Sequence, residues 1–216
     1  MPLLPSAATI RTEVALPLRF ADGYAATARV CTFAGLVDGR EHLALVFGEA
    51  RLGAPPLVRL HSECLTGDVF GSERCDCGAQ LRESVERIDA AGGVLLYLRQ
   101  EGRGIGLYRK LDAYLLQDAG LDTYEANLAL GHAEDERDYT AAAQMILALG
   151  LSGGVALLSN NPDKAAQLAR LGVIVIERVP TRLHLTAANA RYLATKAQHG
   201  DHTLDLPLDL TCRPAG

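Results

Sequence analysis

Short apolar segments rich in valine and leucine occupy the first third of the chain and predict β-strands. Turns containing glycine and aspartate separate these segments, as is typical of adjoining strands. The predicted strands cover residues 14–20, 26–33, 42–47 and 57–60. The last of them leads directly into a cysteine-rich loop, which places that loop at the carboxyl end of a strand.

The hydrophobic period becomes helical after Cys77. Leu81, Val85 and Ile88 recur at helical spacing and predict a helix over residues 80–91, which Gly92 and Gly93 end. The apolar run 94–98 is typical of a strand buried in a parallel sheet. The later pattern predicts helices at 107–119, 126–130, 139–149, 162–171 and 189–198, and strands at 155–158 and 173–176.

This alternation predicts an α/β (α+β) fold: a mixed β-sheet core with an N-terminal β-rich part, helices packed around it, and the cysteine-rich loop at a strand end. We find no internal repeat and no low-complexity linker, so we expect a single domain over residues 1–216, with its core at about 14–196. Residues 199–216 lack a clear pattern, and we expect a mobile tail there.

Composition narrows the class of protein. The chain of 216 residues is 49% hydrophobic and 22% charged, as soluble enzymes are, and its net charge of -5 argues against bulk binding of nucleic acid. We identify no signal peptide and no apolar run long enough to cross a bilayer. Five cysteines in such a chain suggest a reducing compartment. We therefore expect a cytoplasmic protein with no membrane partner.

Three cysteines, Cys64, Cys75 and Cys77, follow the pattern C-x10-C-x-C and predict a zinc site. Thiolates favour zinc, and three protein ligands leave a fourth position for water, as in catalytic sites. Two alternatives remain open: a Cys64–Cys75 disulfide, and a structural site completed by Cys31 or Cys212. Cys31 is otherwise expected in the core, and Cys212 in the tail.

A glycine-rich loop, Gln100-Glu101-Gly102-Arg103-Gly104-Ile105-Gly106, follows the predicted strand 94–98. Its glycines allow backbone amides to approach a ligand, and Arg103 can offer two hydrogen bonds to phosphate at the start of the next helix. The spacing matches neither a dinucleotide-binding fingerprint nor a P-loop. A tight strand-to-helix turn explains the loop equally well.

Two further segments combine charge with possible capping. In Glu134-Asp135-Glu136-Arg137-Asp138, Asp135 can transfer protons and Arg137 can meet a phosphate, although an acidic helix start is the simpler interpretation. In the segment 159–164, Asn161 suits an N-cap and Pro162 the first helical position. Capping does not explain the cation Lys164 in the first turn, whereas a bound anion would.

The remaining polar and aromatic residues have weaker signals. His61 can serve as a fourth zinc ligand, but a histidine beside a metal loop more often contacts substrate. We expect packing roles for four tyrosines: Tyr97, Tyr108, Tyr124 and Tyr139.

Taken in order, five motifs resemble GTP cyclohydrolase II of riboflavin biosynthesis. They read R-L-H-S-E-C-L-T-G-D, R-C-D-C-G-x-Q-L, R-Q-E-G-R-G-I-G-L, D-E-R-D-Y and S-N-N-P-D-K. The resemblance covers about residues 14–196 and is densest between Arg59 and Lys164. It implies a hydrolase acting on cyclic amidine C–N bonds, which converts GTP to 2,5-diamino-6-(5-phospho-D-ribosylamino)pyrimidin-4(3H)-one, formate and pyrophosphate.

The same resemblance implies roles for individual residues. Cys64, Cys75 and Cys77 would bind one zinc ion per chain, and Mg2+ would accompany the triphosphate. Asp135 matches the proton acceptor, Arg137 the nucleophile, and Tyr114 the tyrosine needed for ring opening and loss of formate. It also implies a homodimer, and the residues that would contact GTP are Arg59, Leu60, His61, Ser62, Glu63, Gln80, Glu101, Gly102, Arg103, Thr123, Ser159 and Lys164.

Elementary chemistry qualifies the implied roles. A guanidinium group stays protonated, so stabilising charge on the α-phosphate is an easier role for Arg137 than nucleophilic attack. Ser159 stands where many relatives have threonine, and the hydroxyl is retained. The dihydroxybutanone-phosphate synthase domain of bifunctional relatives is missing, so we expect only the one activity.

Three rival functions remain to be weighed. One is a family member that opens the imidazole ring and keeps the formyl group, and Tyr114 argues against it. Another is a GTP-binding or zinc-sensing module without catalysis, which predicts a disturbed cysteine triad or a missing Arg137. The third, a zinc deaminase, requires an H-x-E…P-C-x-x-C signature that the sequence lacks.

Overall fold

The computed structural model describes residues 7–133, 135–186 and 189. The chain forms two compact units. The first, here called the sheet unit, comprises Met1–Ser62, Leu81–Arg99 and Asp138–Thr181. The second, here called the cysteine unit, comprises Glu63–Gln80, Gln100–Arg137 and Arg182–Gly216.

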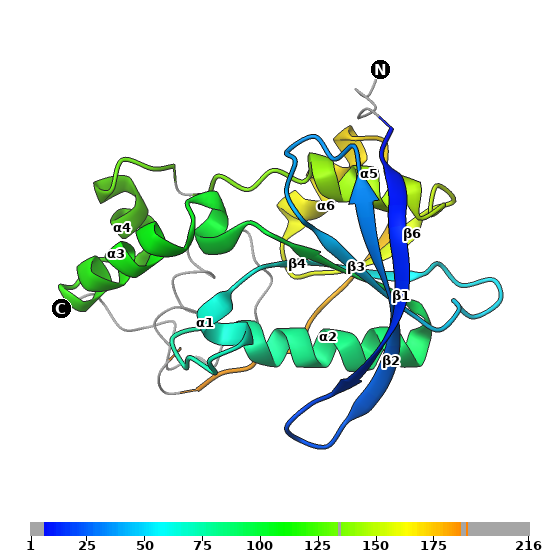
Figure 1. Cartoon of the computed structure of the whole chain (residues 1–216). Coiled ribbons are helices and arrows are strands. Elements are labelled where there is room, and N and C mark those ends of the chain that lie inside the picture. Colours follow the sequence, from blue (N-terminus) through cyan, green and yellow to red (C-terminus); the bar gives the residue numbers. More distant parts are fainter. Residues whose placement is uncertain (1–6, 134, 187–188, 190–216) are drawn as a thin grey trace. The chain divides into compact units, whose positions relative to one another are not determined.

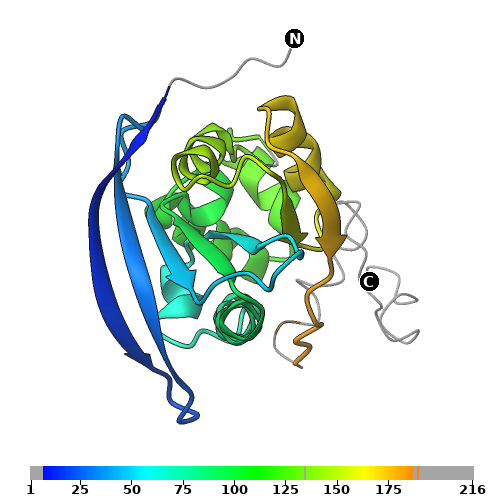
Figure 2. The same cartoon turned by 90° about the vertical axis from the view of Figure 1, so that its right-hand side faces the viewer.

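A seven-stranded mixed sheet forms the sheet unit, in the order β1-β2-β3-β5-β4-β6-β7. Neighbours from β1 to β5 pair antiparallel, whereas β5, β4, β6 and β7 pair parallel. Figure 2 shows β1 and β2 as a long two-stranded ribbon. The strands are β1 Thr9–Arg19, β2 Ala25–Ala34, β3 Leu43–Phe47, β4 Leu57–Ser62, β5 Gly93–Leu98, β6 Val155–Leu158 and β7 Val175–Val179.

The central strands β4 and β5 bury side chains on both faces of the sheet, since successive side chains of a strand point to opposite faces and helices cover each face there. In β5, Leu96 and Leu98 pack on one face with α5 (Thr140–Ala148) and α6 (Pro162–Arg170). Leu95 packs on the other face with Val85 and Ile88 of α2 (Cys77–Ala91). Figure 1 accordingly shows α2 across the sheet from α5 and α6. The apolar run predicted as a buried strand is buried for this reason.

Gly92 and Gly93 join α2 to β5 where no side chain fits. Gly92 has φ of +78°, and a Cβ atom there would lie 2.1 Å from the carbonyl oxygen of Glu49. A Cβ atom on Gly93 would lie 2.0 Å from the carbonyl oxygen of Leu57. The helix therefore ends, and β5 pairs closely with β4, only because both positions are glycine.

Short helices make up the regular part of the cysteine unit. They are α1 Leu65–Asp68, the 3-10 helix η1 Glu101–Gly104, α3 Leu107–Asp118 and α4 Thr123–Ala129. A capping box starts α4, in which Asp122 accepts from the backbone of Glu125 and the Glu125 side chain accepts from the backbone of Asp122.

The predicted fold class is confirmed: the structure is a mixed α/β protein whose cysteine loop begins two residues after β4 ends at Ser62. Several elements differ from the predictions, among them β1, β7 and α1. β1 starts at Thr9 rather than at residue 14, β7 covers Val175–Val179 rather than 173–176, and the four-residue helix α1 was not predicted. The predicted tail at 199–216, and the predicted helix at 189–198 apart from Asn189, lie outside the described residues.

No helix within the described ranges combines the length and apolar character that a membrane span requires.

The fully buried Leu96 side chain gives a direct test of the sheet core. We expect Leu96→Ala to lower the free energy of unfolding by about 2–5 kcal/mol, because the cavity left in the core closes only partly. Leu16→Ala in β1 is the matched control, because that side chain is 43% exposed, and we expect a loss below about 1 kcal/mol. Urea denaturation measures both, and equal losses would contradict this placement of the core.

Candidate functional site

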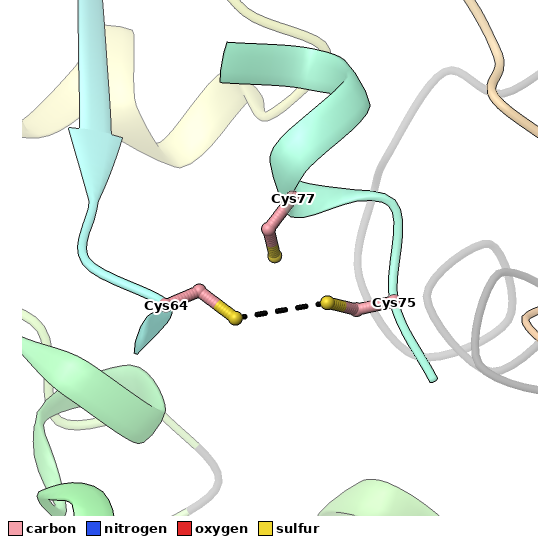
Figure 3. A group of neighbouring side chains, drawn as sticks. All are labelled: Cys64, Cys75 and Cys77. Atoms are coloured by element: carbon pink, nitrogen blue, oxygen red, sulfur yellow. Dashed lines mark hydrogen bonds between the residues drawn. The ribbon is translucent and has the colours of Figure 1, made fainter. Parts of the chain in front are cut away.

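The three cysteines of the predicted zinc site come together and are here called the cysteine cluster. Cys64 follows β4, Cys75 lies in the loop after α1, and Cys77 is the first residue of α2. Their sulfur atoms lie within 4.8 Å of one another, and the Sγ atoms of Cys64 and Cys75 are 3.6 Å apart. Figure 3 shows all three side chains directed toward a common point. All four cysteines of the described residues are free, so the alternative of a Cys64–Cys75 disulfide is not realised.

This geometry fits a zinc ion. A zinc–sulfur bond is about 2.3 Å long, so tetrahedral ligands place sulfur atoms roughly 3.8 Å apart. Among the described residues, the only histidine, cysteine and acidic side chains grouped closely enough to hold a metal ion are these three cysteines. Three soft thiol ligands with no fourth protein ligand in the described chain match the open zinc site predicted from the sequence.

Gly67 of α1 makes room for the cysteine cluster. A Cβ atom at this position would lie 2.8 Å from Sγ of Cys75 and 3.1 Å from Sγ of Cys64. Any side chain here would therefore push the sulfur atoms apart.

The three thiols differ in acidity. Hydrogen bonds from Cys75 and Cys77 lower the pKa of Cys64 well below its ordinary value, against the effect of burial. The hydrogen bond with Cys64 raises the pKa of Cys75 to about 11, and hydrogen bonds with Cys64 and Cys75 raise that of Cys77 strongly. The thiols therefore share protons through hydrogen bonds, and a divalent cation would replace those protons.

Lys110 of α3 contacts the cysteine cluster and was missed by the sequence analysis. Its Nζ donates to Sγ of Cys64 at 3.0 Å, to Oγ1 of Thr66 at 3.0 Å and to Oε1 of Glu101 at 2.9 Å. Its place four residues before Tyr114 is a signal that could have found it, because residues four apart share a helix face.

Tyr114 lies on the same face of α3, beside two cations. Its ring centroid is 4.7 Å from Cζ of Arg74 and 5.8 Å from Nζ of Lys110. Arg74 also donates two hydrogen bonds to Asp118, at 2.7 and 2.8 Å, which tie the loop before Cys75 to α3. Burial raises the pKa of Tyr114, so its hydroxyl group stays protonated at neutral pH and can donate.

The glycine-rich loop holds strained backbone. Gly102 and Arg103 have φ of 62° and 60°, the left-handed region that an arginine rarely adopts. The guanidinium of Arg103 stacks on the ring of Tyr124 at 4.2 Å. Its buried Nη1 atom has no hydrogen-bond partner among the described residues. The loop therefore presents a fixed, cationic donor, as an anion site requires.

Glu101 connects this loop to the cysteine loop. Its Oε2 accepts from the backbone amide of Leu65 at 2.7 Å, and its Oε1 accepts from the amide of Gly102 at 2.9 Å. Lys110 is a third donor to this carboxylate. Glu101 therefore fixes both the glycine-rich loop and the cysteine loop.

Asp135 and Arg137 form a close ion pair. Nε of Arg137 donates to the two carboxylate oxygens of Asp135 at 2.8 and 3.1 Å, and its Nη2 contacts Oδ2 as well. Burial opposes ionisation of Asp135, but the hydrogen bonds and charge of Arg137, together with the charge of Arg103, outweigh it and lower the pKa. Asp135 is therefore a carboxylate able to accept a proton. The acidic helix start is not observed, because α5 begins only at Thr140; Glu134 lies outside the described residues.

Buried polar residues gather at the ends of β4 and β6 in the sheet unit. Nη1 of Arg59 donates to the carbonyl oxygen of Leu158 at 3.0 Å. His61 stacks on Tyr97 with ring centroids 5.6 Å apart. As the sequence predicted, Asn161 caps α6 by accepting from the amide of Asp163 at 2.8 Å. Asn161 also donates through its amide to Oγ of Ser159 at 3.1 Å.

Lys164 extends from the first turn of α6 into the sheet unit rather than into solvent. Its side chain is buried, and Nζ donates to the carbonyl oxygen of Leu60 at 2.8 Å. Helix capping alone did not explain a cation at position 164. The structure shows that the backbone carbonyl of Leu60 is one acceptor for it.

The residues expected to contact GTP belong to both units. The sheet unit holds Arg59, Leu60, His61, Ser62, Ser159 and Lys164. The cysteine unit holds Glu63, Gln80, Glu101, Gly102, Arg103 and Thr123. Gln80 donates to Asp76, and Thr123 is the first residue of α4.

The weaker predictions divide. Cys31 is a buried core thiol in β2, as expected, and Cys212 lies outside the described residues. Tyr139 is buried as a packing residue, but Tyr108 is 82% exposed, so its predicted packing role is wrong.

A cavity of about 490 Å³ adjoins the cysteine cluster within the cysteine unit. Cys75 and Gly67 line it together with residues of the loop around them, and His184, Leu185, Thr186 and Asn189 line the rest. Its volume is in the range of cavities that bind small molecules.

Comparison with known proteins gives one consistent family. The model of the family described as GTP cyclohydrolase II matches residues 11–180. A "GTP cyclohydrolase-2" of Vibrio parahaemolyticus is 53% identical over 178 residues, which is 82% of this chain and 89% of that protein. The "GTP cyclohydrolase-2" of Psychromonas ingrahamii is 46% identical over 199 residues, which is 92% of this chain and 98% of that protein.

A longer relative is also similar. The "Riboflavin biosynthesis protein RibBA" of Bacillus cereus is 49% identical over 199 residues, which is 92% of this chain but 49% of that protein.

The space at Gly67 can be tested by filling it. We expect Gly67→Ala to lower the affinity of the cluster for zinc by about tenfold or more, because the new Cβ atom displaces the sulfur atoms. Gly153→Ala is the control, since a Cβ atom there meets nothing within 4 Å, and it should leave zinc binding unchanged. Chelator competition measures both, and normal zinc affinity in Gly67→Ala would contradict the assigned geometry.

Proposed function

The chain belongs to the GTP cyclohydrolase II family of enzymes, and we propose that it hydrolyses GTP to 2,5-diamino-6-(5-phospho-D-ribosylamino)pyrimidin-4(3H)-one, releasing formate and pyrophosphate, as the first step of riboflavin biosynthesis. The observation that best supports this reaction is the gathering of the cysteine cluster and Tyr114 around Lys110 in the cysteine unit. The relatives are named for the enzyme class, and the product is our inference.

We propose that Cys64, Cys75 and Cys77 hold one zinc ion per chain, on which the activity depends. Zinc bound by three protein ligands supplies a water molecule of lowered pKa at its remaining position. The chain's own contribution is to keep the three sulfur atoms close, through Gly67, and to set their charge, through hydrogen bonding.

Tyr114 is proposed as the donor in loss of formate. Opening the imidazole ring at guanine C8 leaves a formyl group on nitrogen, and its hydrolysis requires protonation of that nitrogen as the C–N bond breaks. Because burial raises the pKa of Tyr114, the phenol keeps its proton at neutral pH and can donate it or a hydrogen bond. The contacts of the Arg74 and Lys110 cations with its ring hold Tyr114 in one orientation.

Arg103, Asp135 and Arg137 are proposed to act at the triphosphate. Nη1 of Arg103, which has no hydrogen-bond partner in the described part of the chain, offers a hydrogen bond to a phosphate oxygen. The ion pair with Asp135 stabilises Arg137 as a cation, which suits charge stabilisation at the α-phosphate better than nucleophilic attack. Asp135, ionised by the same pair, accepts a proton, and Mg2+ accompanies the pyrophosphate that leaves.

We further propose that GTP contacts the twelve residues named above and that the enzyme is a cytoplasmic homodimer with no nucleic-acid or membrane partner. We keep a single domain over residues 1–216 as the proposed organisation.

Incubation of the purified protein with GTP, zinc and magnesium, followed by mass identification of every product, tests the reaction. We expect formate, pyrophosphate and the diaminopyrimidinone phosphate. A product that retains the formyl group would assign the chain to ring opening alone, and unchanged GTP would reduce it to a binding module.

Replacement of one ligand separates catalysis from folding. We expect Cys75→Ser to abolish formate release while leaving thermal unfolding nearly unchanged, because Cys75 lies in a loop and not in the sheet core. Cys31→Ser in β2 controls for loss of a thiol outside the cluster and should still release formate. Unfolding of Cys75→Ser would indicate a structural metal instead.

Removal of a single hydroxyl group tests Tyr114. We expect Tyr114→Phe to release pyrophosphate but to impair formate release by about 100-fold, since the proton donor is lost and the ring is kept. The exposed Tyr108 on the same helix provides the control Tyr108→Phe. An unchanged yield of formate from Tyr114→Phe would remove the residue from the mechanism.

A further inference from the structure

The reaction outlined above gives Lys110 no role beyond its contact with the ring of Tyr114. Its ammonium group has three N–H donors, and three acceptors lie at 2.9–3.0 Å: Sγ of Cys64, Oγ1 of Thr66 and Oε1 of Glu101. The side chain is only 12% exposed, so water competes little for these donors. Every donor has an acceptor, which fixes the cation against one sulfur atom of the cysteine cluster.

The contact between Lys110 and Cys64 can compensate the negative charge of the cysteine cluster. Three thiolates and one divalent zinc ion carry a net negative charge of one, and a buried negative charge is costly without a partner. Lys110 is the cation that contacts a sulfur atom of the cluster. An N–H donor on a thiolate also withdraws electron density from the sulfur and weakens its donation to a metal.

The neighbours of Lys110 indicate that its ammonium group is positioned to contact the sulfur atom of Cys64 and not only to pair with Glu101. Glu101 already accepts two backbone hydrogen bonds, from Leu65 and Gly102, so its carboxylate is stabilised without the lysine. Thr66 lies 3.7 Å from the same sulfur atom and turns its hydroxyl oxygen to the ammonium. Both acceptors direct the lysine toward Cys64.

We propose that Lys110 is a positioning residue that balances the charge of the thiolate cluster and limits electron donation by Cys64, so that a metal held there remains a strong Lewis acid. The inference rests on the metal site of the proposed function. It accounts for how three thiolates, which donate more charge than three imidazoles, can serve a hydrolytic site.

Cobalt in place of zinc makes the donation measurable, because thiolate-to-cobalt charge-transfer absorption moves to longer wavelength as the sulfur becomes a better donor. We expect this band to shift to longer wavelength in Lys110→Met and to stay near its original position in Lys110→Arg, which keeps the charge and the N–H donors. In the zinc enzyme, Lys110→Met should lower kcat by about 10- to 100-fold with little change in KM.

Arg109→Met is the matched control. Arg109 is the neighbouring cation on α3, is exposed, and pairs only weakly with Asp112 at 3.5 Å, so its loss should leave the band and kcat unchanged. An unshifted band in cobalt-loaded Lys110→Met would overturn the proposal.

If Lys110→Met fails to fold or to bind cobalt, Lys110→Gln is measured, because it keeps an N–H donor without the charge. A shift to longer wavelength in Lys110→Gln supports the proposal, whereas an unshifted band, or loss of cobalt from this variant too, assigns Lys110 to folding alone. If the band shifts in Lys110→Met but the zinc-loaded parent protein leaves GTP intact, the proposed reaction is wrong and the proposed role of Lys110 is still supported.

Discussion

Holding three sulfur atoms within 4.8 Å of one another is the constraint on which the site depends. Buried thiolates repel one another, and hydrogen bonding within the cluster lowers the pKa of Cys64 while it raises those of Cys75 and Cys77. The chain places a glycine, Gly67, where a side chain would touch the sulfur atoms of Cys64 and Cys75, and it places the cation Lys110 against the sulfur atom of Cys64. A divalent cation would replace the protons of these thiols.

The cysteine loop is anchored at its two ends by the strand and the helix to which it is directly connected. Cys64 follows a strand paired on both sides, and Cys77 starts a helix of fifteen residues. Glu101 then holds the glycine-rich loop to the start of α1 through the amide of Leu65, and Lys110 joins that carboxylate to Cys64. A continuous set of contacts therefore joins the cysteine loop to α3, the helix that also carries Tyr114.

Much of the fold was predictable because periodicity reports burial. The helix at 80–91, the strand at 94–98 and the glycine pair between them follow from apolar spacing and from the space that only glycine fits. The start of β1 was not predictable, because four of the residues 9–13 are polar and the segment gains its structure by pairing with β2. α1 has only four residues, too few for a helical period.

The site was predictable where motifs carried it and not where tertiary contacts did. Spacing pointed to the cysteines, and the resemblance supplied Tyr114, Asp135 and Arg137. The role of Lys110 depends on three acceptors distant in sequence or on other elements, which no local pattern shows. The left-handed backbone conformation of Arg103 could not be predicted either, because this conformation is usually expected at glycine and not at arginine.

X-ray absorption at the zinc edge of the purified full chain tests the central claim most directly, because it counts the metal's ligands by element and distance. The account predicts one zinc ion per chain with three sulfur ligands at about 2.3 Å and one oxygen or nitrogen ligand. Four sulfur ligands, which would require a further cysteine such as Cys212, or a protein that binds no zinc, would contradict it.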